Sequence, residues 1–201
     1  EFDIETKGDE EIGVIKLIHE RTNYIVRKSV NLSKQTQIIA SNIDLAFLLI
    51  TINNPPTLTT FIDRFLVTAQ AYSIKVILVF NKIDSYKEEE KGEIAYLKDI
   101  YETIGYTCVE VSAIKNINLD TIKNLMKGKT SLFSGHSGVG KTTLLNALEP
   151  GLNLKTKQIS DQHQQGQHTT TFAEMFDLSF NAKIIDTPGI KGFGVVAIDK
   201  E

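Results

Sequence analysis

The sequence predicts an α/β fold, in which a mostly parallel sheet carries helices on both faces and is preceded by a short all-β segment. From about residue 43 onward, apolar runs typical of buried strands alternate with longer segments of helical spacing. Residues 1–38 instead contain only short, β-branched, partly alternating runs around the turn "HERTN". This rhythm is typical of a small antiparallel sheet or barrel. We therefore expect two domains, residues 1–38 and 39–201.

The bulk composition is that of a soluble globular protein. The 201 residues, of which 41% are hydrophobic and 23% charged, suffice for one substantial core and a smaller unit. The longest apolar run, "AFLLITI", is far shorter than the roughly twenty residues of a membrane span. The N-terminus lacks a cationic and apolar leader, and the single cysteine, Cys108, excludes an internal disulfide framework. We expect a cytoplasmic protein without membrane contact, with Cys108 as a core thiol.

The alternation after residue 43 defines the expected elements. Strands are predicted at residues 45–52, 75–80, 107–112, 131–134, 171–180 and 182–186. Helices are predicted near residues 56–72, 87–104 and 119–127, with a further helix beginning at Lys141. Strands joined by crossover helices form parallel sheets that bind ligands at the carboxyl ends of their strands. Each motif described below lies at such an end.

A glycine-rich stretch, "GHSGVGKT", follows the apolar run "SLF" and opens the helix at Lys141. It completes the pattern GxxxxGK[ST], in which glycines allow backbone N–H groups to surround phosphate oxygens. In this pattern Lys141 reaches the terminal phosphates, and the hydroxyl of Thr142 ligates Mg²⁺. The candidate phosphate-binding residues are Gly135, His136, Ser137, Gly138, Val139, Gly140, Lys141, Thr142 and Thr143.

A second motif, "NKID", follows the buried run "KVILVF" and has the form of a guanine-recognition loop. The carboxylate of Asp84 can accept hydrogen bonds from the N1–H and the exocyclic amine of guanine, which adenine does not offer. Lys82 is expected to lie along the base, and Asn81 to brace the loop. The next strand ends in "SAI", where Ser112 and Ala113 are the candidates and the backbone N–H of Ala113 would meet guanine O6. Asp84 therefore disfavours an ATP-using enzyme.

Two further segments complete a GTPase set. The strand ending in "IIDTPG" places Asp186 to hold Mg²⁺ through water and the N–H of Gly189 to contact the γ-phosphate. Between this segment and the P-loop, "HTTTFAE" offers a threonine to the metal, from among Thr169, Thr170 and Thr171. The polar stretch before it suits a loop that orders around a triphosphate.

These motifs follow one another in the usual GTPase order, but rotated, so that the guanine loop precedes the P-loop. Rotation is structurally tolerable because each strand and helix unit packs locally. The sequence resembles the circularly permuted, ribosome small-subunit-dependent GTPases, the RsgA or YjeQ family. The resemblance covers nearly the whole chain and is carried by "SVNLSKQTQIIASNID", "NKID", "VSA", "GHSGVGKTTLLNAL", "GQHTTTFAE" and "DTPGIKGFG".

The resemblance implies a circularly permuted P-loop GTPase preceded by the C-terminal part of an OB-fold, with Mg²⁺ as cofactor and GTP hydrolysed to GDP and phosphate. It implies action in late maturation of the 30S ribosomal subunit, with 16S rRNA as a partner and the protein a monomer. Zinc is expected only in a downstream domain absent from this chain, since Cys108 and the four histidines lack zinc-site spacing. The basic residues proposed to face rRNA are Lys16, Arg21, Arg27, Lys28 and Lys34.

No catalytic residue can be assigned from the sequence. The position after the "DTPG" glycine, which often holds a water-orienting glutamine, is Ile190. The resemblance implies a histidine further on, but that position is Ala197. Three alternatives therefore stay open: a GTPase of small-subunit assembly, a GTP-dependent rRNA or ribosome-binding switch with little intrinsic hydrolysis, and a permuted GTPase of large-subunit assembly.

Overall fold

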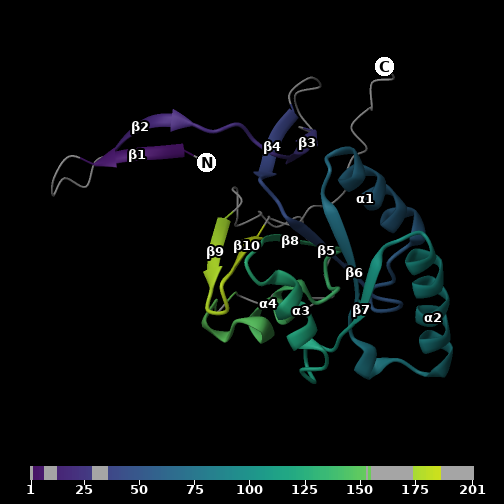
Figure 1. Ribbon diagram of the computed structural model, residues 1–201. Coiled ribbons are helices and arrows are strands. Elements are labelled where there is room, and N and C mark those ends of the chain that lie inside the picture. Colours follow the sequence, from purple (N-terminus) through teal and green to yellow (C-terminus); the bar gives the residue numbers. More distant parts are fainter. Residues whose placement is uncertain (1, 7–12, 29–35, 153, 155–173, 187–201) are drawn as a thin grey trace, which may run out of the picture.

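The computed structural model describes residues 2–6, 13–28, 36–152, 154 and 174–186, and every structural statement below concerns these residues. A six-stranded sheet runs through the molecule in the order β7-β6-β5-β8-β10-β9 (Figure 1). Its strands are β5 (Leu45–Ile50), β6 (Lys75–Phe80), β7 (Thr107–Glu110), β8 (Thr130–Ser134), β9 (Glu174–Leu178) and β10 (Ala182–Asp186). All neighbours pair in parallel except β9 and β10, which are antiparallel. The predicted mostly parallel sheet is therefore confirmed.

Side chains of the central strand β5 alternate between two separate cores. Ala46, Leu48 and Ile50 face one core, whereas Leu45, Phe47 and Leu49 face the other. The period of two of an extended strand gives each face its own apolar set, and the continuous apolar run of β5 follows from burial on both sides.

Helices cover both faces of this sheet, as the alternation in the sequence predicts. Buried side chains of α1 (Thr59–Ala71) and α2 (Glu88–Thr103) join the first core. Those of α3 (Leu119–Met126) and α4 (Lys141–Leu148) join the second. Two short 3₁₀ turns, η1 (Ile83–Ser85) and η2 (Pro150–Leu152), follow β6 and α4. Within the described residues, no helix is long and apolar enough to cross a membrane.

The N-terminal part consists of two antiparallel strand pairs, as expected from its short β-branched runs. β1 (Phe2–Thr6) pairs with β2 (Gly13–Ile18), and β3 (Tyr24–Lys28) pairs with β4 (Thr36–Ser41). Strand β4 spans the expected domain boundary at residue 38. Ile25 and Ala40 of the second pair belong to the core that α1 and α2 cover. This pair is therefore packed against the larger domain.

The helix expected from residue 56 begins later, at Thr59. The preceding residues form a closed loop, in which the Thr57 N–H donates to the Thr51 carbonyl at 2.8 Å and the Thr51 N–H donates to the Thr57 hydroxyl at 3.1 Å. Pro55 and Pro56 have no N–H to donate and restrict the residues before them to non-helical conformations, which delays the helix. The expected core thiol, Cys108, is half-buried, and burial raises its pKa to about 11.

Candidate functional site

The described motif loops leave the sheet at one edge, formed by the carboxyl ends of its parallel strands. The segment that starts at Asn81 follows β6, Ser112 lies just beyond β7, and the P-loop that starts at Gly135 follows β8. β5 lies between β6 and β8, so the loop after β5 lies between the two nucleotide motifs. This third loop carries none of the expected motifs.

The P-loop passes very close to its neighbours, and two glycines make this possible. Gly135 and Gly140 have φ values of +145° and +94°, in the left-handed range that favours glycine. A Cβ added at Gly135 would lie 2.8 Å from the carbonyl oxygen of Leu49, and one at Gly140 would lie 2.5 Å from Nδ2 of Asn81. The glycines are therefore required for the loop to reach both β5 and the guanine motif.

The first turn of α4 presents the cation and hydroxyls of the P-loop motif. The ammonium of Lys141 donates to the carbonyl oxygens of Gly135 at 2.6 Å and of His136 at 3.0 Å, which folds it over the loop. Thr142 and Thr143 follow it and are partly exposed. This arrangement suits an ammonium that exchanges carbonyl oxygens for phosphate oxygens when a nucleotide binds.

Direct hydrogen bonds join the guanine motif to the P-loop. Asn81 is 1% exposed, and its Nδ2 donates to the carbonyl oxygen of Val139 at 2.8 Å. Its Oδ1 has no partner among the described residues. The ammonium of Lys82 donates to the carbonyl oxygens of Gly138 at 2.8 Å and of Asn54 at 2.6 Å. Burial lowers the pKa of Lys82, an effect that the nearby Asp84 carboxylate opposes.

A small cavity of about 90 Å³ lies where these loops meet. It is lined by Asn81, Lys82, Asp84, Ser85, Ala113, Ile114, Gly140 and Thr143, so both nucleotide motifs contribute to it. The hydroxyl of the buried Ser112 donates to Oδ1 of Asp84 at 2.5 Å and accepts from the Lys115 N–H at 3.0 Å. These contacts fix one carboxylate oxygen of Asp84, an exposed side chain at the cavity.

The loop of residues 51–57 supports this site without belonging to any expected motif. It supplies the Asn54 carbonyl that holds Lys82, and Pro55 lies 3.2 Å from where a Cβ on Gly138 would be. Beside it, the buried Tyr86 hydroxyl donates to the Asn81 carbonyl at 2.8 Å and accepts from the Ile52 N–H at 3.1 Å. Neither this loop nor Tyr86 was predicted from the sequence to support the site. The only local signal was the "NNPPT" turn.

His136 connects the P-loop to α1. Its ring packs on that of Phe61, with the ring centroids 3.9 Å apart and an interplanar angle of 36°. Burial, and secondarily the positive charge of Lys141, lowers the pKa of His136 below its ordinary value of 6.5. The imidazole is therefore held neutral near pH 7 and serves as a packing group between two elements of the site.

The remaining sequence candidates are described in part or not at all. Asp186 is the last residue of β10, and β10 runs parallel to β8, so its backbone lies beside the strand that leads into the P-loop. Gly189, Ile190, Ala197 and the threonines at 169–171 lie outside the described residues. The part of the chain that is described holds no cluster of three or more His, Cys, Asp or Glu side chains suited to a metal.

This sequence matches the model of a known protein family. The model of the RsgA GTPase family matches residues 18–196. This chain belongs to the RsgA GTPase family. Two similar RsgA proteins are both called small ribosomal subunit biogenesis GTPases: that of Christiangramia forsetii is 67% identical over the whole chain, and that of Flavobacterium psychrophilum is 63% identical. The chain spans 64% and 62% of their respective lengths.

Two solved structures are similar to this fold. The crystal structure of YjeQ from Thermotoga maritima aligns with a TM-score of 0.71 and 34% identity, over 88% of this chain and 55% of that one. YloQ, described as a circularly permuted GTPase, aligns with a TM-score of 0.71 and 28% identity, over 96% of this chain and 57% of that one. The expected circular permutation of the P-loop GTPase fold is therefore confirmed.

Removal of the Tyr86 hydroxyl tests the support of the guanine loop. In Tyr86→Phe, the Asn81 carbonyl and the Ile52 N–H lose a shared partner, which costs about 1–3 kcal/mol for buried polar groups. We expect urea unfolding to report a loss of this size, and calorimetry to report equal weakening of GTP and GDP binding. Tyr96→Phe, which alters an exposed tyrosine of α2, is the matched control and should change neither. Wild-type stability and affinity in Tyr86→Phe would contradict the role of this hydroxyl.

The environment of His136 predicts a dependence of stability on pH. Its pKa is lower in the folded chain than in the unfolded one, so the unfolded chain binds the proton more readily. The free energy of unfolding should therefore be unaffected by this group well above pH 6.5 and should fall as the pH drops below that value. In the nucleotide-free protein, His136→Phe should flatten the pH profile of the unfolding free energy below pH 6.5. If the unfolding free energy of His136→Phe falls below pH 6.5 as steeply as that of the wild type, other groups cause the pH dependence.

Proposed function

We propose that this chain binds GTP at the junction of the guanine loop and the P-loop, and hydrolyses it to GDP and phosphate during maturation of the small ribosomal subunit in the cytoplasm. The observation that carries the proposal is the direct contact between the motifs, in which Asn81 and Lys82 donate to carbonyls of the P-loop at 2.8 Å. Two motifs that specify different parts of one nucleotide are thus held as one unit.

Recognition of guanine is assigned to the cavity beside Asp84. One oxygen of this carboxylate accepts from the Ser112 hydroxyl, which holds that oxygen in place at the cavity. The carboxylate would accept from the N1–H and the exocyclic amine of guanine, while the backbone N–H of Ala113 would donate to O6. Adenine has neither donor in those places, so the site should select GTP over ATP.

Phosphate binding is assigned to residues 135–143. The backbone N–H groups of the loop and the N-terminus of α4 favour anions, and Lys141 adds a full positive charge. The Thr142 hydroxyl and the Asp186 carboxylate are oxygen donors of the kind that Mg²⁺ prefers, and Gly189 with Thr170 or Thr171 would complete the site around the γ-phosphate. Bound Mg²⁺ would neutralise charge on the phosphates. Within the chain, Lys141 and the loop amides would stabilise the charge that develops on the transferred phosphoryl group.

The ribosomal role rests on the names of the relatives, and residues 1–38 are assigned to the end of an OB-fold that faces 16S rRNA. Lys16 of β2 and Arg21, which follows this strand, are exposed, as a phosphate-binding surface requires. A monomer is proposed, and zinc is assigned to a domain outside this chain. Action on the large subunit is disfavoured by the two relatives, which are named for the small one.

A second function, a GTP-dependent switch with little hydrolysis, is favoured by one observation. Neither Ile190 nor Ala197 can orient a water molecule, because neither carries a hydrogen-bonding side chain. Under the primary proposal, the group that positions the attacking water is supplied by the ribosomal subunit or by another part of the protein.

Single-turnover hydrolysis separates these two functions. We expect slow hydrolysis of GTP by the protein alone and an increase of at least about tenfold on addition of purified small ribosomal subunits, if the subunit lowers the barrier by about 1.4 kcal/mol or more. Large subunits serve as the matched control and should not accelerate hydrolysis. An unchanged rate with small subunits, together with nucleotide-dependent subunit binding, would favour the switch.

A further inference from the structure

The outward side of α2 carries apolar side chains where a surface helix normally carries polar ones. Ile94, Leu97 and Tyr101 pack into the core, so the opposite side should be polar. Instead, Tyr96 and Ile100 lie at a spacing of four residues and are 66% and 38% exposed. Ile104, four positions further and directly after the helix, is 62% exposed. Side chains four apart lie on the same side of a helix and form one stripe.

A glycine continues this stripe toward the start of the helix. Gly92 lies four positions before Tyr96, inside α2, where glycine weakens a helix relative to alanine. A Cβ added at Gly92 would meet no atom within 4 Å, so packing within the described chain does not require its absence. A glycine there leaves the backbone open to close approach from outside.

The charged side chains of α2 that flank the stripe are acidic. Glu89, Glu93 and Asp99 are exposed and lie within about 60° of Tyr96 around the helix axis. The two lysines of α2 lie about 140° and 160° from Tyr96. Lys91 pairs with Glu88 at 2.8 Å, and Lys98 pairs with Glu110 of β7 at 2.6 Å. The outward side therefore combines an apolar stripe with negative charge.

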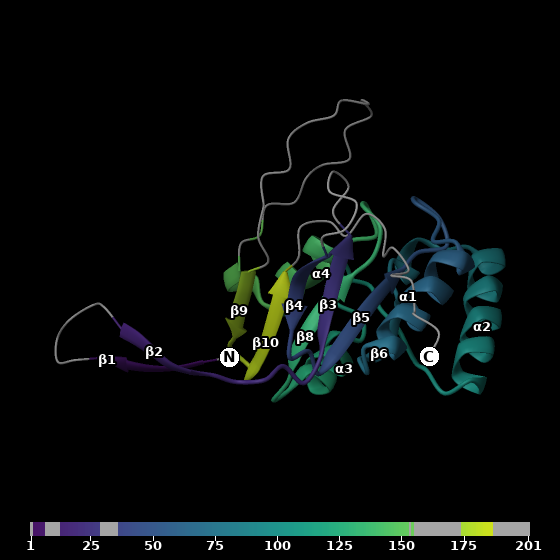
Figure 2. The same cartoon turned by 90° about the horizontal axis from the view of Figure 1, so that it is seen from above.

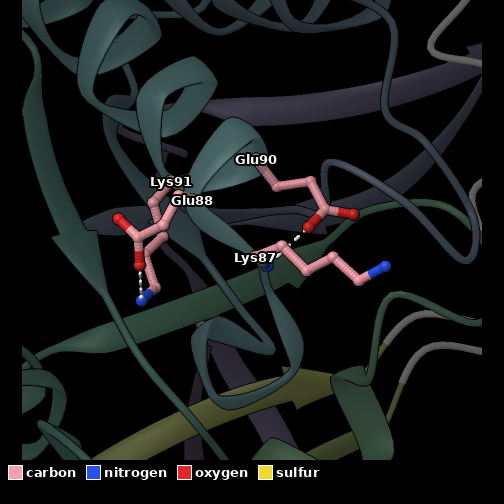
Figure 3. A network of polar contacts seen from close by, with 4 residues as sticks. All are labelled: Lys87, Glu88, Glu90 and Lys91. Atoms are coloured by element: carbon pink, nitrogen blue, oxygen red, sulfur yellow. Dashed lines mark hydrogen bonds and ion pairs between the residues drawn. The ribbon is translucent and has the colours of Figure 1, made fainter.

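The helix holds this surface at a fixed place in the fold. Figures 1 and 2 show α2 at the end of the molecule furthest from β9. Figure 3 shows Glu90 accepting from the backbone N–H of Lys87 at 2.6 Å, and the same carboxylate also accepts from the side-chain amide of Asn53. Because Asn53 belongs to the loop that supports Lys82, the start of α2 is tied to the nucleotide site.

We propose that the outward side of α2, defined by Gly92, Tyr96, Ile100 and Ile104 with Glu89, Glu93 and Asp99, docks a basic protein segment of the small ribosomal subunit. The inference rests on the proposed function for the identity of the subunit. Negative charge repels the phosphate backbone, so RNA does not fit this surface. A segment with lysine or arginine around apolar side chains complements it in both respects, and an exposed tyrosine is a typical anchor of such interfaces.

Site-specific crosslinking identifies the occupant. The protein with benzoylphenylalanine in place of Tyr96 is irradiated with purified small subunits and a non-hydrolysable GTP analogue. The control carries the same group at Glu102, an exposed position about 120° around the helix. The proposal predicts a crosslink from position 96 that resists nuclease, is lost with protease and maps to a lysine- or arginine-rich ribosomal peptide. A crosslink to rRNA or to this chain itself, or no crosslink from bound protein, overturns it.

Charge reversal separates this surface from the proposed function as a whole. The double variant Glu89→Lys with Glu93→Lys should bind small subunits at least fivefold more weakly while keeping its affinity for GDP, and Glu102→Lys should bind as the wild type does. Unchanged or tighter binding by the double variant overturns the α2 surface alone. Failure of the unmodified protein to bind small subunits overturns the proposed function and, with it, the docking surface.

Discussion

Replacement of Gly140 by alanine is expected to abolish tight nucleotide binding while the sheet and its helices stay folded. Gly140 has a φ of +94°, which costs an alanine about 1–2 kcal/mol. The new Cβ would also lie 2.5 Å from Nδ2 of Asn81, and an overpacked contact of this kind costs about 1–3 kcal/mol. The P-loop and the guanine loop would have to separate, and the site would lose the hydrogen bond between Asn81 and Val139.

We expect the affinity of Gly140→Ala for GDP to fall by at least about thirtyfold, which corresponds to about 2 kcal/mol. Titration with a fluorescent GDP analogue measures the affinity, and circular dichroism checks the fold. Gly92→Ala is the matched control, since a Cβ at Gly92 would meet no atom within 4 Å. It should leave the affinity unchanged and stabilise α2 by about 0.5–1 kcal/mol. Similar GDP affinities in the two variants would show that the close approach of the loops does not matter for binding.

The second large effect is expected from Asp84→Asn, which should change the preferred base from guanine to xanthine. The variant would lose the carboxylate that we propose accepts from the guanine N1–H and amine, and its own amide N–H would face that amine. Hydrogen bonds to charged groups contribute about 1.5–3 kcal/mol each, so GTP affinity should fall by roughly a hundredfold or more. Xanthine carries an oxygen in place of the amine, and this oxygen can accept from the new amide N–H.

Competition between GDP and xanthosine diphosphate for one fluorescent nucleotide measures this change. In Asp84→Asn the ratio of the two affinities should invert, whereas Asp99→Asn, an exposed acid of α2, should keep the wild-type preference for GDP. Weak binding of both nucleotides without inversion would mean that Asp84 supports the loop but does not contact the base.

The parts of the fold and site that could be predicted from the sequence are those with side-chain signatures. Buried strands such as β5 and β6 are continuous apolar runs, and the motifs at Asn81 and Gly135 directly follow strands. Because neighbouring parallel strands end at one edge, strand positions and motif spacing together predict that these motifs meet. The hydrogen bonds that join them are consistent with that prediction.

The support of the site could not be predicted, because it depends on backbone groups. Lys82 is held by the Asn54 carbonyl, and both partners of the Tyr86 hydroxyl are backbone atoms, which any residue type can supply. His136 packs on Phe61, which lies far from it in the sequence. No sequence pattern indicates that these two residues are in contact. Strand β4 likewise extends past residue 38, because its pairing with β3 continues to Ser41. The change in composition near residue 38 does not show where this strand ends.

A crystal structure of the protein with GDP and Mg²⁺ tests most directly whether the two loops bind one nucleotide. We expect one nucleotide that joins the two loops, with the Asp84 carboxylate about 2.7–3.2 Å from N1 and N2 of the base and the phosphates against Lys141. A nucleotide held over Lys141 whose base lies away from Asp84, outside the cavity that both loops line, would contradict it.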